Sequence, residues 1–336
     1  MLEYFIKRMV SMVITVVVVS IAAFVVIQLP PGDYLTAYIA DQESQGQRFT
    51  DDEIASLRIE FGLDKPMTAQ YFSWIWKIVT KGDLGWSLKY KRPVSDMILE
   101  RLPMTLLIFF CTIVVTYTLA ISIGVYSATH QYSVGDYFFT TVGFIGIATP
   151  HFLSALVVMY IFQYYLGFDV GGLQSADYRD AVWLGPQFIG KLWDLIKHLV
   201  VPVIIIGTAG TAGLIRVMRG TLLDELRSQY VTTARAKGVS ELKLLFKYPV
   251  RIACNPIVST IGWLLPRIIS GQAIVEIVLN LPTISPLLLV GLKQQDTYLA
   301  GSIILILTCL VVIGTFISDI LLVLVDPRIR LEKRAT

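Results

Sequence analysis

Six long apolar stretches limit what this chain can fold into. Each holds roughly the 20 apolar residues that a helix needs to cross a bilayer core. The 336-residue chain is 55% hydrophobic and only 16% charged, with a mean hydropathy of +0.66. A water-soluble domain of this length would expose too much apolar surface. We therefore predict an all-α polytopic membrane protein with six transmembrane helices, at residues 9–29, 103–127, 136–162, 199–218, 257–279 and 300–325.

The distribution of Lys and Arg predicts the orientation. Basic residues favour short cytoplasmic loops, whereas loops longer than about 60 residues cross the membrane largely regardless of charge. With the N-terminus inside, the cytoplasmic segments hold 14 of the 28 basic residues, and the two short outer loops hold 4. We therefore expect both termini in the cytoplasm. The predicted parts are 1–29 (N-terminus and first helix), 30–102 (exterior domain), 103–325 (five-helix core with a cytoplasmic loop at 219–256) and 326–336 (cytoplasmic tail).

The exterior domain carries two helix signals. Thr50 stands three residues before Glu53, which is the capping-box spacing at a helix start. Residues 70–79 have amphipathic spacing and are rich in aromatic side chains, namely Tyr71, Phe72, Trp74 and Trp76. These aromatic residues suit either the lipid headgroup region or a docking surface for a partner protein.

The cytoplasmic loop predicts two helices joined at a glycine. Residues 221–237 have helical character, and Gly238 is a suitable left-handed stop. Ser240 would cap a second helix at 240–248, with Glu241 in its first turn and Pro249 beyond its end.

The second helix of this loop is amphipathic. One predicted face carries Leu242, Leu245 and Phe246, and another carries Lys243 and Lys247. On the residues alone, such a helix suits two places: the membrane interface beside anionic lipid, or a groove on a partner protein.

A family resemblance favours the second place. Tyr230-Val-Thr-Thr-Ala-Arg-Ala-Lys-Gly238 resembles the signature loop of ABC importer permeases, in the variant of the dipeptide/oligopeptide branch. The short form of that signature is Glu-Ala-Ala, three residues, then Gly. Thr232, Thr233, Ala234 and Gly238 occupy the matching positions, without the acidic residue.

Other motifs of the branch follow in order along about residues 1–330. They are Pro31-Gly-Asp33, Gly62-Leu-Asp-Lys-Pro66, Gly82-Asp-Leu-Gly85, Arg101-Leu-Pro103 and Asp326-Pro-Arg-Ile-Arg330. Two positions depart from the branch and bear on the substrate subgroup: Tyr248, where it often has His, and Ile252, where it often has Asn.

The resemblance implies a permease subunit of an ATP-driven, binding-protein-dependent importer in a bacterial or archaeal cytoplasmic (inner) membrane. Its implied partners are two ATP-binding subunits, a second homologous permease and an exterior solute-binding protein. ATP and Mg would be held by the ATPase subunits, because this chain has no Gly-x-x-x-x-Gly-Lys-Ser/Thr loop. The residues implied in ATPase coupling are Thr232, Thr233, Ala234, Gly238, Ser240, Glu241, Leu242, Leu245, Phe246 and Pro256.

Three charged residues within the predicted spans are candidates for the translocation pathway or a gate. Arg267 in the fifth span should face protein or water, since an Arg at the bilayer centre costs about 2.5–3.5 kcal/mol on insertion scales. It either pairs or shares a polar cavity with Asp319 in the sixth span, or it caps carbonyls freed by Pro266. Glu276 is either a gate or substrate contact or a structural hydrogen-bonding group.

Other function classes find less support in the sequence. An ion-coupled secondary transporter would show inverted repeats with broken helices. An intramembrane enzyme would need a paired catalytic constellation, and nucleic-acid binding a basic face larger than a net charge of +3 provides. Three scattered cysteines predict neither a disulfide framework nor a metal site. The branch name favours peptides as substrate, with oligosaccharides or a nickel chelate as alternatives.

Overall fold

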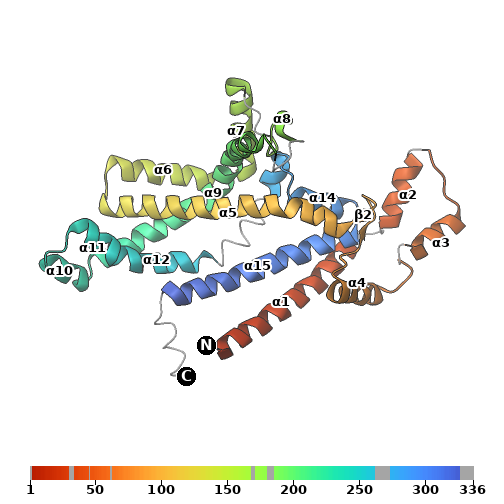
Figure 1. The fold of residues 1–336 in the computed structure, drawn as a ribbon, viewed down its shortest axis with the longest axis horizontal. Coiled ribbons are helices and arrows are strands. Elements are labelled where there is room, and N and C mark those ends of the chain that lie inside the picture. Colours follow the sequence, from red (N-terminus) through yellow and green to blue (C-terminus); the bar gives the residue numbers. More distant parts are fainter. Residues whose placement is uncertain are drawn as a thin grey trace. The chain divides into compact units, whose positions relative to one another are not determined.

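The structure, a computed structural model, describes residues 2–29, 34–44, 46–60, 63–167, 171–179, 185–261 and 273–325. Within these ranges the chain is almost entirely helical, with a single two-stranded hairpin (Figure 1). Contacts divide the chain into two compact units. The first unit is Met1–Pro103 with Thr283–Val312, and the second is Met104–Pro282 with Ile313–Thr336. Two helices, α5 (Val94–Thr129) and α15 (Thr297–Val325), contribute residues to both units.

The first unit combines a long apolar helix with short elements. In chain order these are α1 (Leu2–Gln28), α2 (Tyr34–Ser44), α3 (Asp51–Glu60), α4 (Met67–Lys81), β1 (Trp86–Ser87), β2 (Arg92–Pro93), the start of α5, α14 (Ile284–Lys293) and the first part of α15. The two strands are antiparallel, with Trp86 opposite Pro93. The predicted capping box is confirmed at α3, because the Thr50 N–H donates to Glu53 Oε2 at 2.8 Å and the Glu53 N–H to Thr50 Oγ1 at 3.4 Å.

Helix α4 is anchored by its aromatic side chains. Trp74 is 2% exposed, and its ring stacks on that of Phe24 with centroids 5.7 Å apart. The Tyr71 hydroxyl hydrogen-bonds the Ser20 hydroxyl at 2.8 Å. The predicted helix at 70–79 is therefore present within α4, but two of its four aromatic residues fill the unit's own interior. Phe72 and Trp76 remain about 70% exposed.

A buried carboxylate joins the hairpin of the first unit to the start of α15. The Ser87 hydroxyl donates to Asp296 Oδ2 at 2.7 Å, and the Leu299 N–H donates to Asp296 Oδ1 at 3.1 Å. Asp296 is fully buried. Burial raises the pKa of Asp296, although its hydrogen bonds to Ser87 and to main-chain N–H groups oppose that rise.

The second unit contains the rest of α5 and α15 and most of the remaining helices. These are α6 (Val134–Ala148), α7 (His151–Leu166), α8 (Ala176–Arg179), α9 (Phe188–Leu226), α10 (Gln229–Ala236), α11 (Glu241–Lys247) and α12 (Pro249–Ser259). Helices α5 and α9 approach closely. A Cβ on Gly124 would lie 2.5 Å from the Met218 Cβ, and one on Gly207 would lie 2.9 Å from Thr116 Oγ1. Small residues thus allow these two helices to pack closely.

Three described helices are long and apolar enough to cross a membrane: Ile6–Gln28, Val94–Thr129 and Thr297–Leu321. Two bent pairs raise the number to five if each is one span, namely Val134–Ala148 with His151–Tyr165, and Phe188–Thr208 with Gly210–Leu226. The predicted fifth span, 257–279, lies partly outside the described residues. The structure therefore supports a multi-pass all-α membrane protein.

Two predicted spans differ from the observed helices. The stretch 136–162 is not one straight span, because it bends by 107° between α6 and α7. Pro150 has no N–H to continue the helix, and Thr149 before it is extended (φ −93°, ψ 126°). Helix α9 begins at Phe188 rather than 199, so part of the predicted outer loop is helical. Hydropathy missed this start because Lys191 and Asp194 lower the local average without ending the helix.

Candidate coupling site

Residues 227–228 separate α9 from α10. The prediction of one helix from 221 to 237 is wrong here, because Ser228 is extended (φ −70°, ψ 147°) and starts a new helix. Helix α10 is held by the fully buried Val231 and by the Tyr230 hydroxyl, which donates to Glu225 Oε2 at 2.5 Å. Burial and the neighbouring Glu225 raise the pKa of Tyr230, so this donor keeps its proton. Thr232 and Thr233 are exposed on α10.

Gly238 ends α10 with a Schellman motif. Its φ of +77° is left-handed, as the sequence predicted. The Gly238 N–H donates to the Arg235 carbonyl at 3.0 Å, and the Val239 N–H donates to the Ala234 carbonyl at 3.3 Å. These two bonds give Ala234 and Gly238 a defined structural role, which is to turn the chain sharply between α10 and α11.

An ion pair fastens the two helices across this turn. Arg235 Nε lies 2.6 Å from Glu241 Oε1, and Arg235 Nη2 lies 3.1 Å from Glu241 Oε2. The guanidinium of Arg235 holds the pKa of Glu241 below its usual value. Ser240 stands at the N-cap position of α11, but its hydroxyl makes no capping bond, contrary to our prediction. The first turn of α11 is exposed there, so water can satisfy its N–H groups.

Helix α11 points its apolar residues in two directions. Leu244 is 1% exposed, and Leu245 packs against the cluster described below. Leu242 and Phe246 are 74% and 58% exposed. Leu242, Leu245 and Phe246 lie on one face of α11 by their spacing, as predicted, but only Leu245 at the edge of that face reaches the interior, and Leu244 from the opposite face is the buried anchor. We call Leu242 and Phe246, four residues apart, the exposed α11 face; Lys243 and Lys247 are exposed beside it.

The base of the loop is a hydrophobic cluster from three helices. It comprises Val125 and Ala128 of α5, Met218 and Leu222 of α9, and Val250, Ala253 and Ile257 of α12. The Thr221 hydroxyl adds a bond to the Ala253 carbonyl at 3.3 Å. Pro249 is the first residue of α12, which ends α11 as predicted, and the side chain of Pro256 is exposed on α12. A displacement of α11 would therefore reach α5, α9 and α12.

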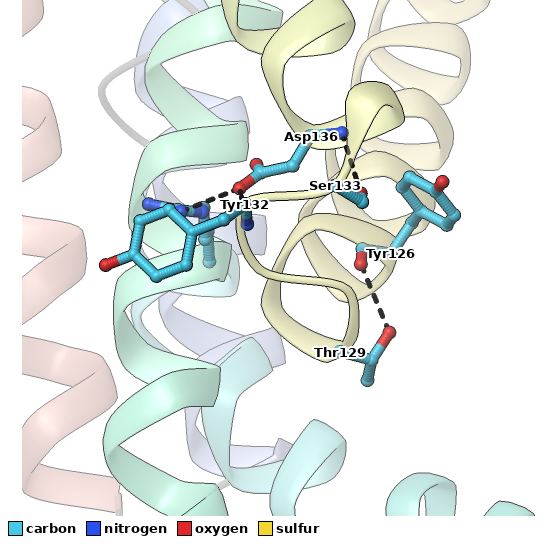
Figure 2. Close-up of polar contacts among 6 residues, drawn as sticks. Tyr126, Thr129, Tyr132, Ser133 and Asp136 are labelled. Carbon is cyan, nitrogen blue, oxygen red and sulfur yellow. Dashed lines mark hydrogen bonds and ion pairs between the residues drawn. The ribbon is translucent and has the colours of Figure 1, made fainter.

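A second polar group on the same unit escaped the sequence reasoning. Asp136 is 3% exposed, and its Oδ2 accepts from Arg219 Nη2 at 2.8 Å and from the Tyr132 N–H at 3.1 Å. The Asp136 N–H donates to Ser133 Oγ at 3.2 Å (Figure 2). The pair joins α6 to α9 across 83 residues of sequence. The Ser-x-x-Asp spacing of 133–136 is a helix-start signal that would have located its acidic half.

The pathway candidates are only partly visible. Arg267 lies outside the described residues, so its pairing with Asp319 stays a prediction. Glu276 is fully buried in a helical segment of the second unit, and its sequence neighbour Val275 belongs to a hydrophobic cluster of that unit. Asp319 is half-buried on α15, next to Ser318, whose hydroxyl lies 3.5 Å from the Val258 carbonyl. Among the described residues no group of His, Cys, Asp or Glu could hold a metal ion.

Comparison with known proteins identifies the family. Residues 120–331 match the family described as "Binding-protein-dependent transport system inner membrane component". Residues 1–109 match the N-terminal family of the same membrane components.

Relatives match over nearly the whole chain. The oligopeptide transport system permease protein AppB of Bacillus subtilis is 34% identical over 331 residues, covering 98% of this chain and 99% of that protein. OppB of Haemophilus influenzae is 28% identical with 98% and 100% coverage, and the dipeptide permease DppB of Escherichia coli is 27% identical with 99% and 100% coverage. The chain therefore belongs to the binding-protein-dependent transport family, as the inner-membrane permease component of an ABC importer rather than an enzyme.

Proposed function

We propose that this chain forms half of the translocation pathway of an ATP-driven importer of di- or oligopeptides. Three relatives that match along almost their full length carry oligopeptide or dipeptide transport in their names. In this proposal the chain crosses the inner membrane six times with both termini in the cytoplasm. It works with a second homologous permease, two ATPase subunits that hold ATP and Mg, and an exterior solute-binding protein.

The exposed α11 face is the observation that carries the mechanism. Leu242 and Phe246 point away from the unit while Leu244 anchors the same helix to it. Fully burying a Leu or a Phe side chain contributes about 1.5–3 kcal/mol each, so a partner groove gains by covering this face. The flanking lysines would favour an acidic rim on that groove. We assign this groove to the ATPase subunit and α11 to the role of coupling helix.

Force applied to α11 has two routes into the membrane helices. One passes through Arg235 and Glu241 to α10 and on to the end of α9. The other passes through Leu245 and Pro249 into the cluster of α5, α9 and α12. Closure of the ATPases around ATP would then tilt these helices between inward-open and outward-open states. Arg267, Glu276 and Asp319 keep their proposed place along the pathway or at a gate.

Co-purification tests the coupling role. The double variant Leu242→Asp/Phe246→Asp should insert normally but lose its ATPase partner by about tenfold or more, since two buried apolar contacts become charged. Phe72→Asp is the matched control, because Phe72 is 69% exposed on α4 in the first unit. Equal recovery of the ATPase with both variants would contradict the proposal.

Reconstitution tests the transport activity and the substrate. Proteoliposomes holding the full complex and its binding protein should take up labelled peptide, and vanadate should block that uptake. Uptake that needs a sodium or proton gradient and resists vanadate would instead indicate a secondary transporter. Uptake of an oligosaccharide or a nickel chelate without competition by peptide would be consistent with ATPase coupling but would contradict the assignment of peptides as the substrate.

A further inference from the structure

The turn between α5 and α6 is partly exposed and mixes polar with apolar side chains. No Lys, Arg, Asp or Glu occurs from Ala128 to Gly135, although this segment is predicted to be cytoplasmic. Tyr132 is 74% exposed and Val134 87% exposed. A cytoplasmic turn without Lys or Arg gains little from anionic lipid headgroups. An exposed aromatic and an exposed aliphatic side chain at its tip suit contact with a protein.

This turn is held in a shape that Tyr132 would not adopt by itself. Its φ is +59°, in the left-handed region that non-glycine residues rarely occupy. The Asp136 carboxylate accepts the Tyr132 N–H, and Gly135 lies so close to the Tyr126 hydroxyl that an added Cβ would be 2.3 Å from it. Figure 2 shows the contact of Asp136 with the Tyr132 main chain. Strained backbone of this kind persists where surrounding contacts over-determine it, and it gathers at functional sites.

The turn is attached to the base of the coupling loop. Arg219, which holds Asp136, lies two helical turns before the end of α9 at Leu226. Ala128, at the end of α5, belongs to the same hydrophobic cluster against which Leu245 of α11 packs. Figure 1 shows the α5–α6 turn and α11 at the same end of the second unit. A protein bound to α11 is therefore close to this turn.

We propose that Tyr132 and Val134 form a second contact for the ATPase subunit that binds α11, with Asp136 and Arg219 as the residues that position it. This inference rests on the proposed function. Contacts with both α11 and this turn would fix the orientation of the ATPase subunit. Contact with a single short helix would leave that subunit free to rotate. Through Asp136 and Arg219, a movement of the ATPase shifts α6 together with α9.

Site-specific photo-cross-linking in the assembled complex tests the contact. The photoreactive residue p-benzoylphenylalanine replaces Tyr132, Phe246 or, as an exterior control, Phe72. We expect adducts with the ATPase from positions 132 and 246 and none from 72. Adducts from 246 alone, or from 132 to the second permease, would overturn this inference and leave the coupling helix standing. Adducts from neither cytoplasmic position would overturn the proposed function as well.

Substitution of Tyr132 separates a contact from a purely structural role. Tyr132→Gly relieves the left-handed backbone, so its thermal stability should equal or exceed that of the wild type. If the ring contacts the ATPase, peptide taken up per ATP should still fall severalfold. Tyr132→Phe, which keeps the ring, should retain coupling. Full coupling in Tyr132→Gly would overturn the proposal. It would show that Tyr132 serves only the shape of the turn, which glycine adopts equally well.

Discussion

Helices α4 and α11 look alike in sequence and behave differently in the fold. Each is short and amphipathic and carries large apolar side chains among lysines. In α4 the interior takes Tyr71 and Trp74, which pack on α1. In α11 the interior takes Leu244, while Leu242 and Phe246 face outward. The first helix is fixed by two large aromatic side chains, and the second is fixed on one side by Leu244 and Leu245 while its other side stays exposed.

Two similar amphipathic sequences can therefore serve different purposes, one structural and one functional. A helix whose apolar side packs against the rest of its own chain contributes to stability. One that leaves an apolar pair exposed on one side, while the other side packs on neighbouring helices, can pass a partner's movement to those helices. Substitutions in α4 should therefore act on folding and substitutions around α11 on coupling, and each prediction below tests that division.

The largest expected effect is on stability, at Trp74. Trp74→Ala should lower the free energy of unfolding by about 3–5 kcal/mol, because it empties a buried site between α4 and α1. Trp76→Ala, on the same helix but 70% exposed, should change it by no more than about 0.5 kcal/mol. Thermal unfolding of the purified protein in detergent measures both. Similar losses of unfolding free energy in the two variants would contradict the view that only the Trp74 side of α4 packs on α1.

The next effect is on coupling, at Gly238. Proline fixes φ near −65° and removes an N–H, whereas Gly238 needs +77° and donates to Arg235. The misfit costs about 3 kcal/mol locally. Gly238→Pro should therefore insert and assemble but hydrolyse ATP without uptake. Gly238→Ala, with no neighbour within 4 Å and only a backbone penalty of about 1–2 kcal/mol, should lose less. Normal uptake by Gly238→Pro would contradict the role of the turn.

The sequence predicted the helices better than their ends. Apolar stretches predicted where the long helices lie, but α5 and α9 start earlier, at Val94 and Phe188, where charged residues continue the helix outside the apolar part. Hydropathy indicates which part of a helix is surrounded by lipid. The length of the helix depends on its main-chain hydrogen bonds, which continue beyond that part. The bend at Pro150 was missed because a proline is compatible with both a straight and a broken span.

The candidate coupling loop was predictable where its signals are local. Gly238 ends α10 because it can adopt a left-handed φ, and Pro249 ends α11 because it has no N–H; the structure confirms both. The direction of α11 was not predictable, because a seven-residue helix does not show whether Leu242 or Leu244 faces inward. The cluster from α5, α9 and α12 decides that. Asp136 and Arg219 were missed for the same reason, since only the fold brings them together.

A smaller effect on stability is expected at the buried Asp296. Asp296→Ala leaves the Ser87 hydroxyl and the Leu299 N–H without their acceptor, which costs about 1–3 kcal/mol. Burial raises the pKa of Asp296 above its ordinary 3.8, so the folded state prefers the protonated carboxyl. The stability that this group contributes is therefore greatest at low pH and falls as pH rises through the folded pKa.

Asp296→Asn removes the charge of this group at every pH, and although its amide NH2 must face one of the N–H donors, the pH dependence of its stability can still be compared. Its thermal unfolding, compared with that of the wild type between about pH 4 and pH 7, should lack the decline assigned to Asp296. Parallel curves for the two proteins would show that the carboxylate is stabilised as an ion by Ser87 and the main chain.

The smallest expected effect is at the exposed pair Arg235–Glu241. Both side chains are more than half exposed, so Glu241→Gln should leave thermal unfolding almost unchanged. Arg235 lowers the pKa of Glu241, so the pair contributes above the ordinary value of 4.5 and is lost only as pH falls through the lower, folded pKa. Uptake by Glu241→Gln should therefore be slightly lower than that of the wild type, and the difference should not depend on pH near neutrality. High salt should reduce wild-type uptake toward that of the variant, because it screens the ion pair. If Glu241→Gln instead abolished uptake as Gly238→Pro should, the ion pair rather than the glycine turn would carry the movement from α11 to α10.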